Sequence, residues 1–116
     1  MRFTVSLKNN YEFRRLYAKG RSAASPTLVV YMRHTRRDVN RVGFTVTTRL
    51  GNAVTRNRVR RRLREIYRLH EDELLRGTDL VVVARGRSVE AAFGALERDF
   101  LSCCRRLGML REEKEA

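Results

Sequence analysis

The chain has 116 residues, which is enough for one domain with a single core but not for two. Its 26 Lys and Arg residues against 13 Asp and Glu residues give a formal net charge of +13, a field that attracts phosphate polyanions. The sequence has no apolar run long enough to cross a bilayer and no signal-peptide core, so we expect a cytoplasmic protein without a membrane partner.

The cations are almost all arginine, since only Lys8, Lys19 and Lys114 are lysine. Guanidinium groups match phosphate oxygens and stack on bases, which suits RNA. A genome rich in G and C would also favour arginine codons, so the bias alone does not decide the partner. Cys103 and Cys104 are adjacent, match no zinc spacing, and are predicted to be reduced and buried in a helix.

The first elements in chain order are an arm and a helix. Residues 1–8 are predicted to form an extended arm, and residues 11–19 a helix that ends at Gly20. On this helix Phe13 and Tyr17 share a face, and their spacing alone favours ordinary core packing.

Three strands are predicted from runs of β-forming residues. Residues 27–34 and 41–48 alternate apolar and other side chains, and the polar segment 35–40 between them indicates an antiparallel hairpin. Residues 79–84 are continuously apolar, which is typical of a strand buried on both faces. Residues 21–26 are small and polar and indicate a turn with at most a short edge strand.

A helix is predicted to close the domain, with Ser88 as its N-cap, Leu107 at its end and Gly108 as its stop. The tail from about residue 109 is predicted to be frayed. Without repeats or a linker, residues 1–116 are predicted to be a single RNA-binding domain.

The central feature is a helix predicted within residues 51–68, with Asn52 as its N-cap and Thr55 as the alternative cap. Val59, Leu63, Ile66 and Tyr67 form an apolar stripe suited to docking on a sheet. The opposite arc carries polar and basic side chains: Asn57, Arg58, Arg60, Arg61, Arg64 and Arg68. Like charges at such spacing destabilise a helix by roughly 0.2–0.5 kcal/mol per pair, which indicates that a polyanion relieves the repulsion. The alternative is a solvated cationic face with no partner.

The sequence offers little for catalysis by the protein itself. His34 and His70 have no partner at metal-ligand spacing and are predicted to be surface residues. No nucleophile motif, phosphate loop or dinucleotide fingerprint is present. The acids at 71–73 could bind a divalent cation, but they more often only moderate a high positive charge. We therefore predict no catalytic residue and no cofactor or metal bound by the protein.

The segment RVGFTVTTRLGNAVTRNRVRRRLREIYR, residues 41–68, resembles the signature of the protein subunit of bacterial ribonuclease P. Its centre is the triplet Arg56-Asn57-Arg58. The segments FTVSLKNNYEFRRLYAKG, TLVVYMR and DLVVVAR resemble the first helix, a strand and the late strand of that family, so the resemblance covers nearly the whole chain. One departure is Thr47-Thr48-Arg49, where many members have Ser-Lys-Lys.

The resemblance implies an α+β fold: a two-layer α-β sandwich of αβββαβα topology with a left-handed βαβ crossover, ribosomal protein S5 domain 2-like. It implies a subunit of an RNA-catalysed endoribonuclease that removes the 5′ leader from precursor tRNA. The RNA subunit would hold the catalytic Mg²⁺, and the protein alone would not be catalytic. The expected partners are the catalytic RNA and precursor tRNA, and no DNA is expected.

The resemblance also implies two sets of site residues. Contacts with the catalytic RNA fall to Arg56, Asn57, Arg58, Arg60, Arg61, Arg62, Arg64 and Arg68. A cleft for the single-stranded leader falls to Phe13, Arg14, Tyr17, Tyr31, Arg49 and Arg85. In that case Phe13 and Tyr17 would be partly exposed. The alternatives are a ribosomal or general RNA-chaperone protein without a role in cleavage, and a protein-only nuclease.

Overall fold

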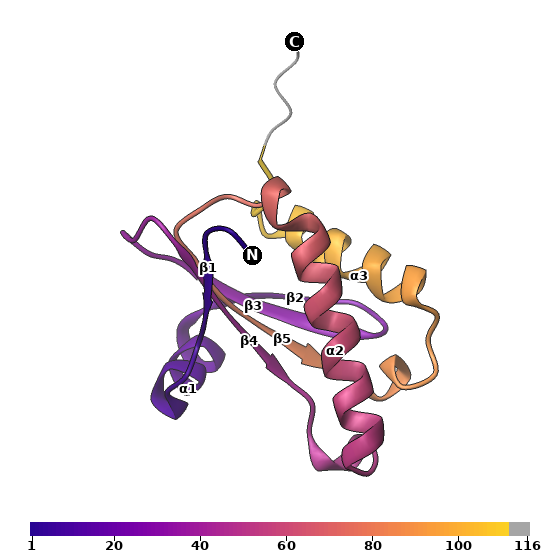
Figure 1. The fold of residues 1–116 in the computed structure, drawn as a ribbon. Helices are drawn as coiled ribbons and strands as arrows, with labels where there is room; N and C mark the ends of the chain where they lie inside the picture. Colours follow the sequence, from indigo (N-terminus) through magenta and orange to yellow (C-terminus); the bar gives the residue numbers. More distant parts are fainter. Residues whose placement is uncertain (112–116) are drawn as a thin grey trace.

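The computed structural model describes residues 1–111, which form three α-helices and one mixed sheet (Figure 1). The strands are β1 (Thr4–Ser6), β2 (Arg21–Ala24), β3 (Leu28–His34), β4 (Asn40–Thr45) and β5 (Thr78–Ala84). The helices are α1 (Asn10–Lys19), α2 (Ala53–His70) and α3 (Phe93–Arg106), with short 3-10 turns η1 (Thr48–Leu50), η2 (Glu71–Glu73) and η3 (Gly86–Ser88). No helix in this part of the chain is long and apolar enough to span a bilayer.

The strands lie in the order β1-β4-β5-β3-β2. β5 is antiparallel to β3 and parallel to β4, and α2 connects the parallel neighbours β4 and β5. Viewed with α2 in front and these two strands pointing up, β5 lies to the left of β4, so the crossover is left-handed (Figure 1). The predicted α+β fold is confirmed, and the predicted N-terminal arm additionally contributes β1, a short edge strand parallel to β4.

The predicted hairpin between residues 27–34 and 41–48 is wrong. β5 lies between β3 and β4 and pairs with both, in registers that join Tyr31 to Val81 and Val81 to Gly43. The physical reason is the composition of β5, which is apolar on both faces and is therefore most stable at the centre of the sheet. The antiparallel hairpin is instead formed by β2 and β3.

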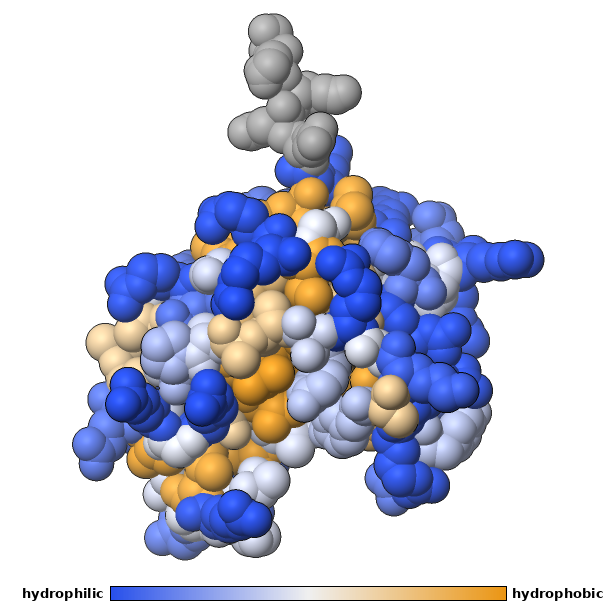
Figure 2. All heavy atoms as spheres, turned by 180° about the vertical axis from the view of Figure 1, so that it is seen from behind, coloured by the Kyte–Doolittle hydropathy of each residue, from blue (hydrophilic) through white to orange (hydrophobic). Residues whose placement is uncertain are grey.

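The two faces of the sheet have separate cores. α2 and α3 cover one face, where Val30 and Met32 of β3 pack with Leu80 of β5 in the main core. α1 lies across the opposite face, where Leu16 contacts a smaller cluster around Val81. Figure 2 shows this second face, on which an apolar strip runs between hydrophilic side chains.

The last helix begins later than predicted, because Ser88 is not its N-cap. Ser88 is buried in η3, and α3 begins after Ala92, which has no capping side chain. The predicted end near Leu107 and the stop at Gly108, with φ of +70°, are confirmed. Both cysteines are buried in α3 and free.

The tail is ordered further than predicted. Met109 is buried, its carbonyl accepts from the Leu75 backbone, and Leu110 forms a β-bridge with Leu74. The predicted fraying from residue 109 is therefore wrong for residues 109–111. The rest of that tail lies outside the described residues.

The acids after α2 have structural partners. Glu71 is 3% exposed, and its carboxylate accepts from the backbone N–H groups of Arg2 and Phe3 and from the Thr4 hydroxyl. Burial alone would raise the pKa of Glu71, but these donors outweigh it and hold the pKa below its usual value. Glu71 therefore fixes the N-terminal segment beside the end of α2.

His70 is not the free surface residue that was predicted, since its side chain is only 15% exposed. Its ring nitrogens lie 2.7 Å from Glu73 and 2.6 Å from Glu97, which joins the end of α2 to α3. Burial lowers the pKa of His70, but the hydrogen bonds and charges of Glu97 and Glu73 outweigh burial and raise it overall.

The raised pKa of His70 predicts a pH-dependent contribution to stability. Because the folded-state pKa exceeds the unfolded one, the stabilisation is complete below the unfolded value and is lost as pH rises through the folded value. The free energy of unfolding lost in His70→Gln should therefore be larger at about pH 5.5 than at about pH 9. Urea titrations of both proteins measure this difference, and equal losses at the two pH values would contradict it.

Candidate RNA interface

The arginine helix α2 forms because its apolar positions recur on one side. Asn52 caps it, with its side chain accepting from the Thr55 backbone N–H at 2.9 Å, as the sequence predicts. Val59, Leu63, Ile66 and Tyr67 are all buried in the main core. Burying a stripe of this size contributes roughly 1.5–3 kcal/mol per side chain, which outweighs the repulsion among the arginines. The charged arc is thereby held away from the sheet.

Most of the predicted arginines on α2 face solvent. Within residues 1–111, six of the seven form no ion pair with a carboxylate: Arg56, Arg58, Arg60, Arg61, Arg62 and Arg64. Arg68 is also exposed, but it forms a 2.6 Å ion pair with Glu65. These guanidinium groups are neither turned inward nor matched one for one by acids, so the surface keeps a strong positive charge.

Arg62 differs from the other arginines of α2. Its Nη2 donates to the Ala91 carbonyl at 2.9 Å and so ties α2 to the segment before α3. Burial and the neighbouring charge of Arg58 lower its pKa. The geometry makes Arg62 a structural contact more than a free phosphate ligand, whereas the resemblance places it among the RNA-binding residues.

Local contacts orient three of the free cations without neutralising them. Arg60 donates to the Asn57 side chain at 2.8 Å, and Arg56 donates to the Gly51 carbonyl at 3.0 Å. The Arg64 guanidinium lies 5.8 Å from the centre of the Phe44 ring, within cation–π range. Such contacts reduce the side-chain entropy that binding an anion would otherwise cost.

A cleft adjoins α2 on the side of α1. It encloses about 480 Å³ and brings together side chains from α1, the end of β4 and α2. Its lining residues are Asn10, Phe13, Arg14, Tyr17, Phe44, Thr45, Val46 and Arg60. Three of the predicted cleft residues, Phe13, Arg14 and Tyr17, are therefore placed together.

The aromatic side chains of the cleft are held by specific contacts. Phe13 is half-buried over Gly43, where a β-carbon would lie 2.5 Å from two of its ring atoms. Tyr17 is 40% exposed, its hydroxyl lies 2.9 Å from that of Thr45, and its ring meets Tyr31 edge-on at 5.0 Å. Tyr31 thus supports Tyr17 from β3. The cleft offers partly exposed aromatic faces beside cations, a combination suited to single-stranded RNA.

The position of α1 depends on a nearly buried ion-pair group. Arg41 of β4 binds Asp79 of β5 through two hydrogen bonds, at 2.9 and 2.7 Å, and Glu12 of α1 at 2.6 Å. The hydrogen bonding of the Arg41 guanidinium to the Asp79 carboxylate outweighs burial and raises the pKa of Arg41, with Glu12 adding to the effect. All three guanidinium nitrogens of Arg41 donate to these carboxylates, and they thereby hold α1 to the sheet.

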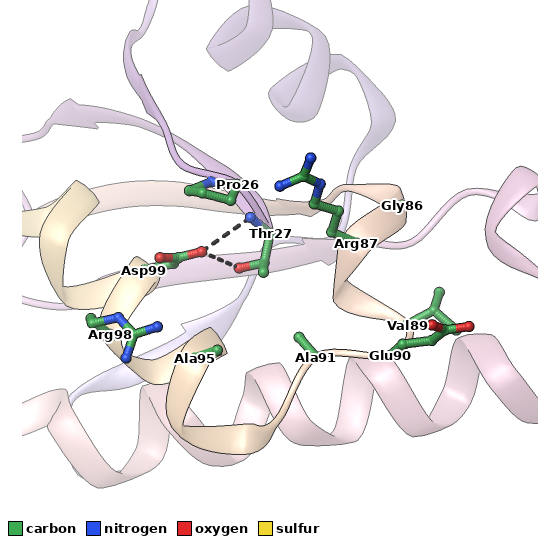
Figure 3. A pocket seen from close by; sticks show the side chains of 10 residues that line it. All are labelled: Pro26, Thr27, Gly86, Arg87, Val89, Glu90, Ala91, Ala95, Arg98 and Asp99. Atoms are coloured by element: carbon green, nitrogen blue, oxygen red, sulfur yellow. Dashed lines mark hydrogen bonds between the residues drawn. The ribbon is translucent and has the colours of Figure 1, made fainter.

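The other two predicted cleft cations, Arg49 and Arg85, do not line this cleft. Arg49 is exposed in η1, and Arg85 donates to the Ser25 carbonyl at 2.8 Å. Arg85 precedes Gly86 of a second hollow of about 440 Å³ beyond β5, in which Thr27 binds Asp99 (Figure 3). Conversely, Phe44 lines the cleft but was not predicted to do so. Its position near the end of a predicted strand, shortly before the arginine helix, could have indicated it.

The described residues contain no group of three or more His, Cys, Asp or Glu side chains arranged to hold a metal ion. The acids at 71–73 do not converge, because Glu71 turns to the N-terminal backbone and Glu73 turns to His70. The chemistry this surface offers is binding of phosphates and bases.

Fold and site together define a small basic α+β protein with an arginine-rich helix beside an aromatic cleft. The sequence model of the family described as Ribonuclease P matches residues 1–108, and the chain belongs to that family. The "Ribonuclease P protein component" of Natranaerobius thermophilus is 40% identical, over 93% of this chain and 94% of the relative. That of Clostridioides difficile is 39% identical, over 89% and 91%.

Solved structures agree with this assignment. A Staphylococcus aureus RNase P protein superposes with a TM-score of 0.83 at 30% identity, covering 91% of this chain and 97% of that one. The RNase P protein from Thermotoga maritima gives a TM-score of 0.77 at 27% identity, covering 84% and 92%.

The contact between Phe13 and Gly43 predicts strong coupling. Gly43→Ala should lower the free energy of unfolding by about 1–3 kcal/mol, because the added methyl group displaces the ring. The same substitution in a Phe13→Ala background should cost much less. Urea denaturation of the two single variants and the double variant tests this, and additive losses would show that the two residues are not coupled.

Proposed function

We propose that this chain is the protein subunit of a ribonuclease P ribonucleoprotein that assists removal of the 5′ leader from precursor tRNA. The observation that carries the proposal is the row of solvent-facing arginines on α2 next to an aromatic cleft. Membership of the Ribonuclease P family supports it. The ribosomal or RNA-chaperone alternative is not favoured, because the relatives named above are RNase P proteins.

The two surfaces bind different RNAs. α2 packs against the catalytic RNA, where its arginines replace counterions along the phosphates. The cleft holds the single-stranded leader, with Phe13 and Tyr17 against bases and Arg14 near phosphates. Reducing the repulsion between the two RNAs lowers the magnesium concentration that their association requires.

Catalysis in this proposal belongs to the RNA. The RNA subunit holds the catalytic Mg²⁺, and the protein contributes binding and orientation in the cytoplasm. Reconstituted cleavage of precursor tRNA at low magnesium tests it, with protein alone, RNA alone and both together. Stimulation of the RNA is expected. Cleavage by the protein alone would point to a protein nuclease, and no stimulation would point to an RNA chaperone.

The α2 surface can be tested through its salt dependence. Arg58→Ala with Arg61→Ala should weaken binding to the catalytic RNA and reduce the slope of log K against log salt by about 1.4, at about 0.7 per phosphate contact. A control of equal charge is Arg98→Ala with Arg105→Ala, two exposed residues of α3. Filter binding over a salt series gives both slopes. An unchanged slope in the α2 variant would exclude this surface.

The cleft can be tested with and without a leader. Phe13→Ala should lower affinity for precursor tRNA by about 5- to 160-fold, the range expected for one stacked base, and leave affinity for mature tRNA unchanged. Binding of both RNAs to the reconstituted holoenzyme measures this. Equal losses for the two RNAs would mean that Phe13 acts only in packing.

A further inference from the structure

Another hollow, lined by basic side chains, lies on the other side of α1 from the cleft. It is separate from the arginine face of α2 and from the cleft. It encloses about 550 Å³, between α1, the end of β3 and the loop that joins β3 to β4. It is lined by Arg15, Arg33, His34, Thr35, Arg36, Arg37, Arg41 and Asp79. In Figure 1 the β3–β4 loop projects beyond the sheet at the end opposite to the exit of β4.

The acids around this hollow are already occupied by other cations. Asp79 and Glu12 bind Arg41, and Asp38 of the loop lies 3.8 Å from Arg76. Across the sheet Asp79 is also in register with Arg33, but both of its oxygens accept from Arg41.

The remaining cations therefore have no acidic partner within residues 1–111. They are Arg15, Arg33, Arg36 and Arg37. They come from three separate elements, so their convergence is a product of the fold and not of one basic run. The four guanidinium groups repel one another, and an anion bound among them would relieve this repulsion.

The loop that carries two of these arginines is held in place. The Thr35 backbone donates to the Gly77 carbonyl at 2.7 Å, and the Arg37 backbone donates to the Thr35 hydroxyl at 3.1 Å. Gly77 has φ of +85°, and a β-carbon there would lie 2.8 Å from the Arg37 carbonyl. A larger residue at 77 would displace the loop. The hollow is accordingly formed before any ligand arrives.

α1 separates this hollow from the cleft but also connects them. Arg14 lines the cleft and the next residue, Arg15, lines the hollow. Tyr11, 53% exposed, precedes them by three and four positions and so lies between the two on the outer side of the helix. Along β4 the hollow at Arg41 and the cleft at Thr45 are four residues apart, or about 13 Å.

We propose that this hollow binds phosphates of the distal part of the leader, which passes from the cleft over α1. The inference rests on the proposed function of the cleft. A single-stranded RNA held at Phe13 and Tyr17 needs only a few more nucleotides to cross α1. Tyr11 offers a stacking surface at the crossing, and the four arginines meet the phosphates beyond it. The protein would then respond to leader length without reading its sequence.

The test uses the reconstituted holoenzyme and two precursor tRNAs, one with a leader that fills only the cleft and one with a leader long enough to pass α1. Arg36→Ala with Arg37→Ala should weaken binding of the long-leader RNA by about tenfold and leave the short-leader RNA unchanged. For this variant the slope of log K against log salt should fall by about 1.4 with the long-leader RNA and stay unchanged with the short-leader RNA. Over a fourfold salt range, that fall corresponds to a change of about sevenfold in affinity. Arg98→Ala with Arg105→Ala is the control of equal charge.

Equal losses for both leaders would overturn the inference, as would a loss of affinity for the catalytic RNA in the absence of tRNA. The second result would assign the hollow to the RNA subunit. No effect on any RNA would also overturn it. Failure of the wild-type protein to distinguish leader-bearing from mature tRNA would instead count against the proposed function of the cleft.

Discussion

The structure depends on the docking of one helix, α2, on the sheet by its apolar side. Val59, Leu63 and Ile66 can be buried only if the arginines between them point outward, because both sets lie on one rigid helix. Stability and binding surface therefore come from the same contact. The free energy released in the core offsets the repulsion of a charged surface that would not form a stable helix by itself.

The arginines divide into two groups by their surroundings. Arg41 has two carboxylates within hydrogen-bonding distance and serves the fold, and Arg62 donates to a carbonyl and ties α2 to the segment before α3. Arg58, Arg61 and Arg64 have solvent on their outer side and no acidic partner within residues 1–111. Net charge alone does not separate these groups. The positions of the acids do, because Glu12 and Asp79 bind Arg41, whereas no acid within residues 1–111 pairs with Arg58, Arg61 or Arg64.

Much of this architecture follows from the sequence. The position of α2, its cap at Asn52 and the buried strand near 79–84 were predictable, since each produces a local periodic or compositional signal, although α2 extends two residues beyond the predicted end at Arg68. The pairing of β5 between β3 and β4 was not, because strand order depends on contacts distant in sequence. Ala92 begins α3 without a capping side chain, so no local signal marked that boundary either.

The site shows the same division. The arginine arc and the aromatic pair Phe13 and Tyr17 could be selected from the sequence and the family resemblance. The placement of Arg85 could not, because its partner, the Ser25 carbonyl, is determined by the turn before β3. The roles of Glu71 and His70 were also hidden, since they depend on the N-terminal segment and on α3.

Arg60 belongs both to the exposed face of α2 and to the wall of the cleft. Helix and cleft are built on one sheet, so their separation is fixed by protein packing. Under the proposed function the subunit acts as a spacer of constant width: it sets how far the end of the leader lies from the RNA that cuts it. A protein this small can do so without contributing a single reacting group.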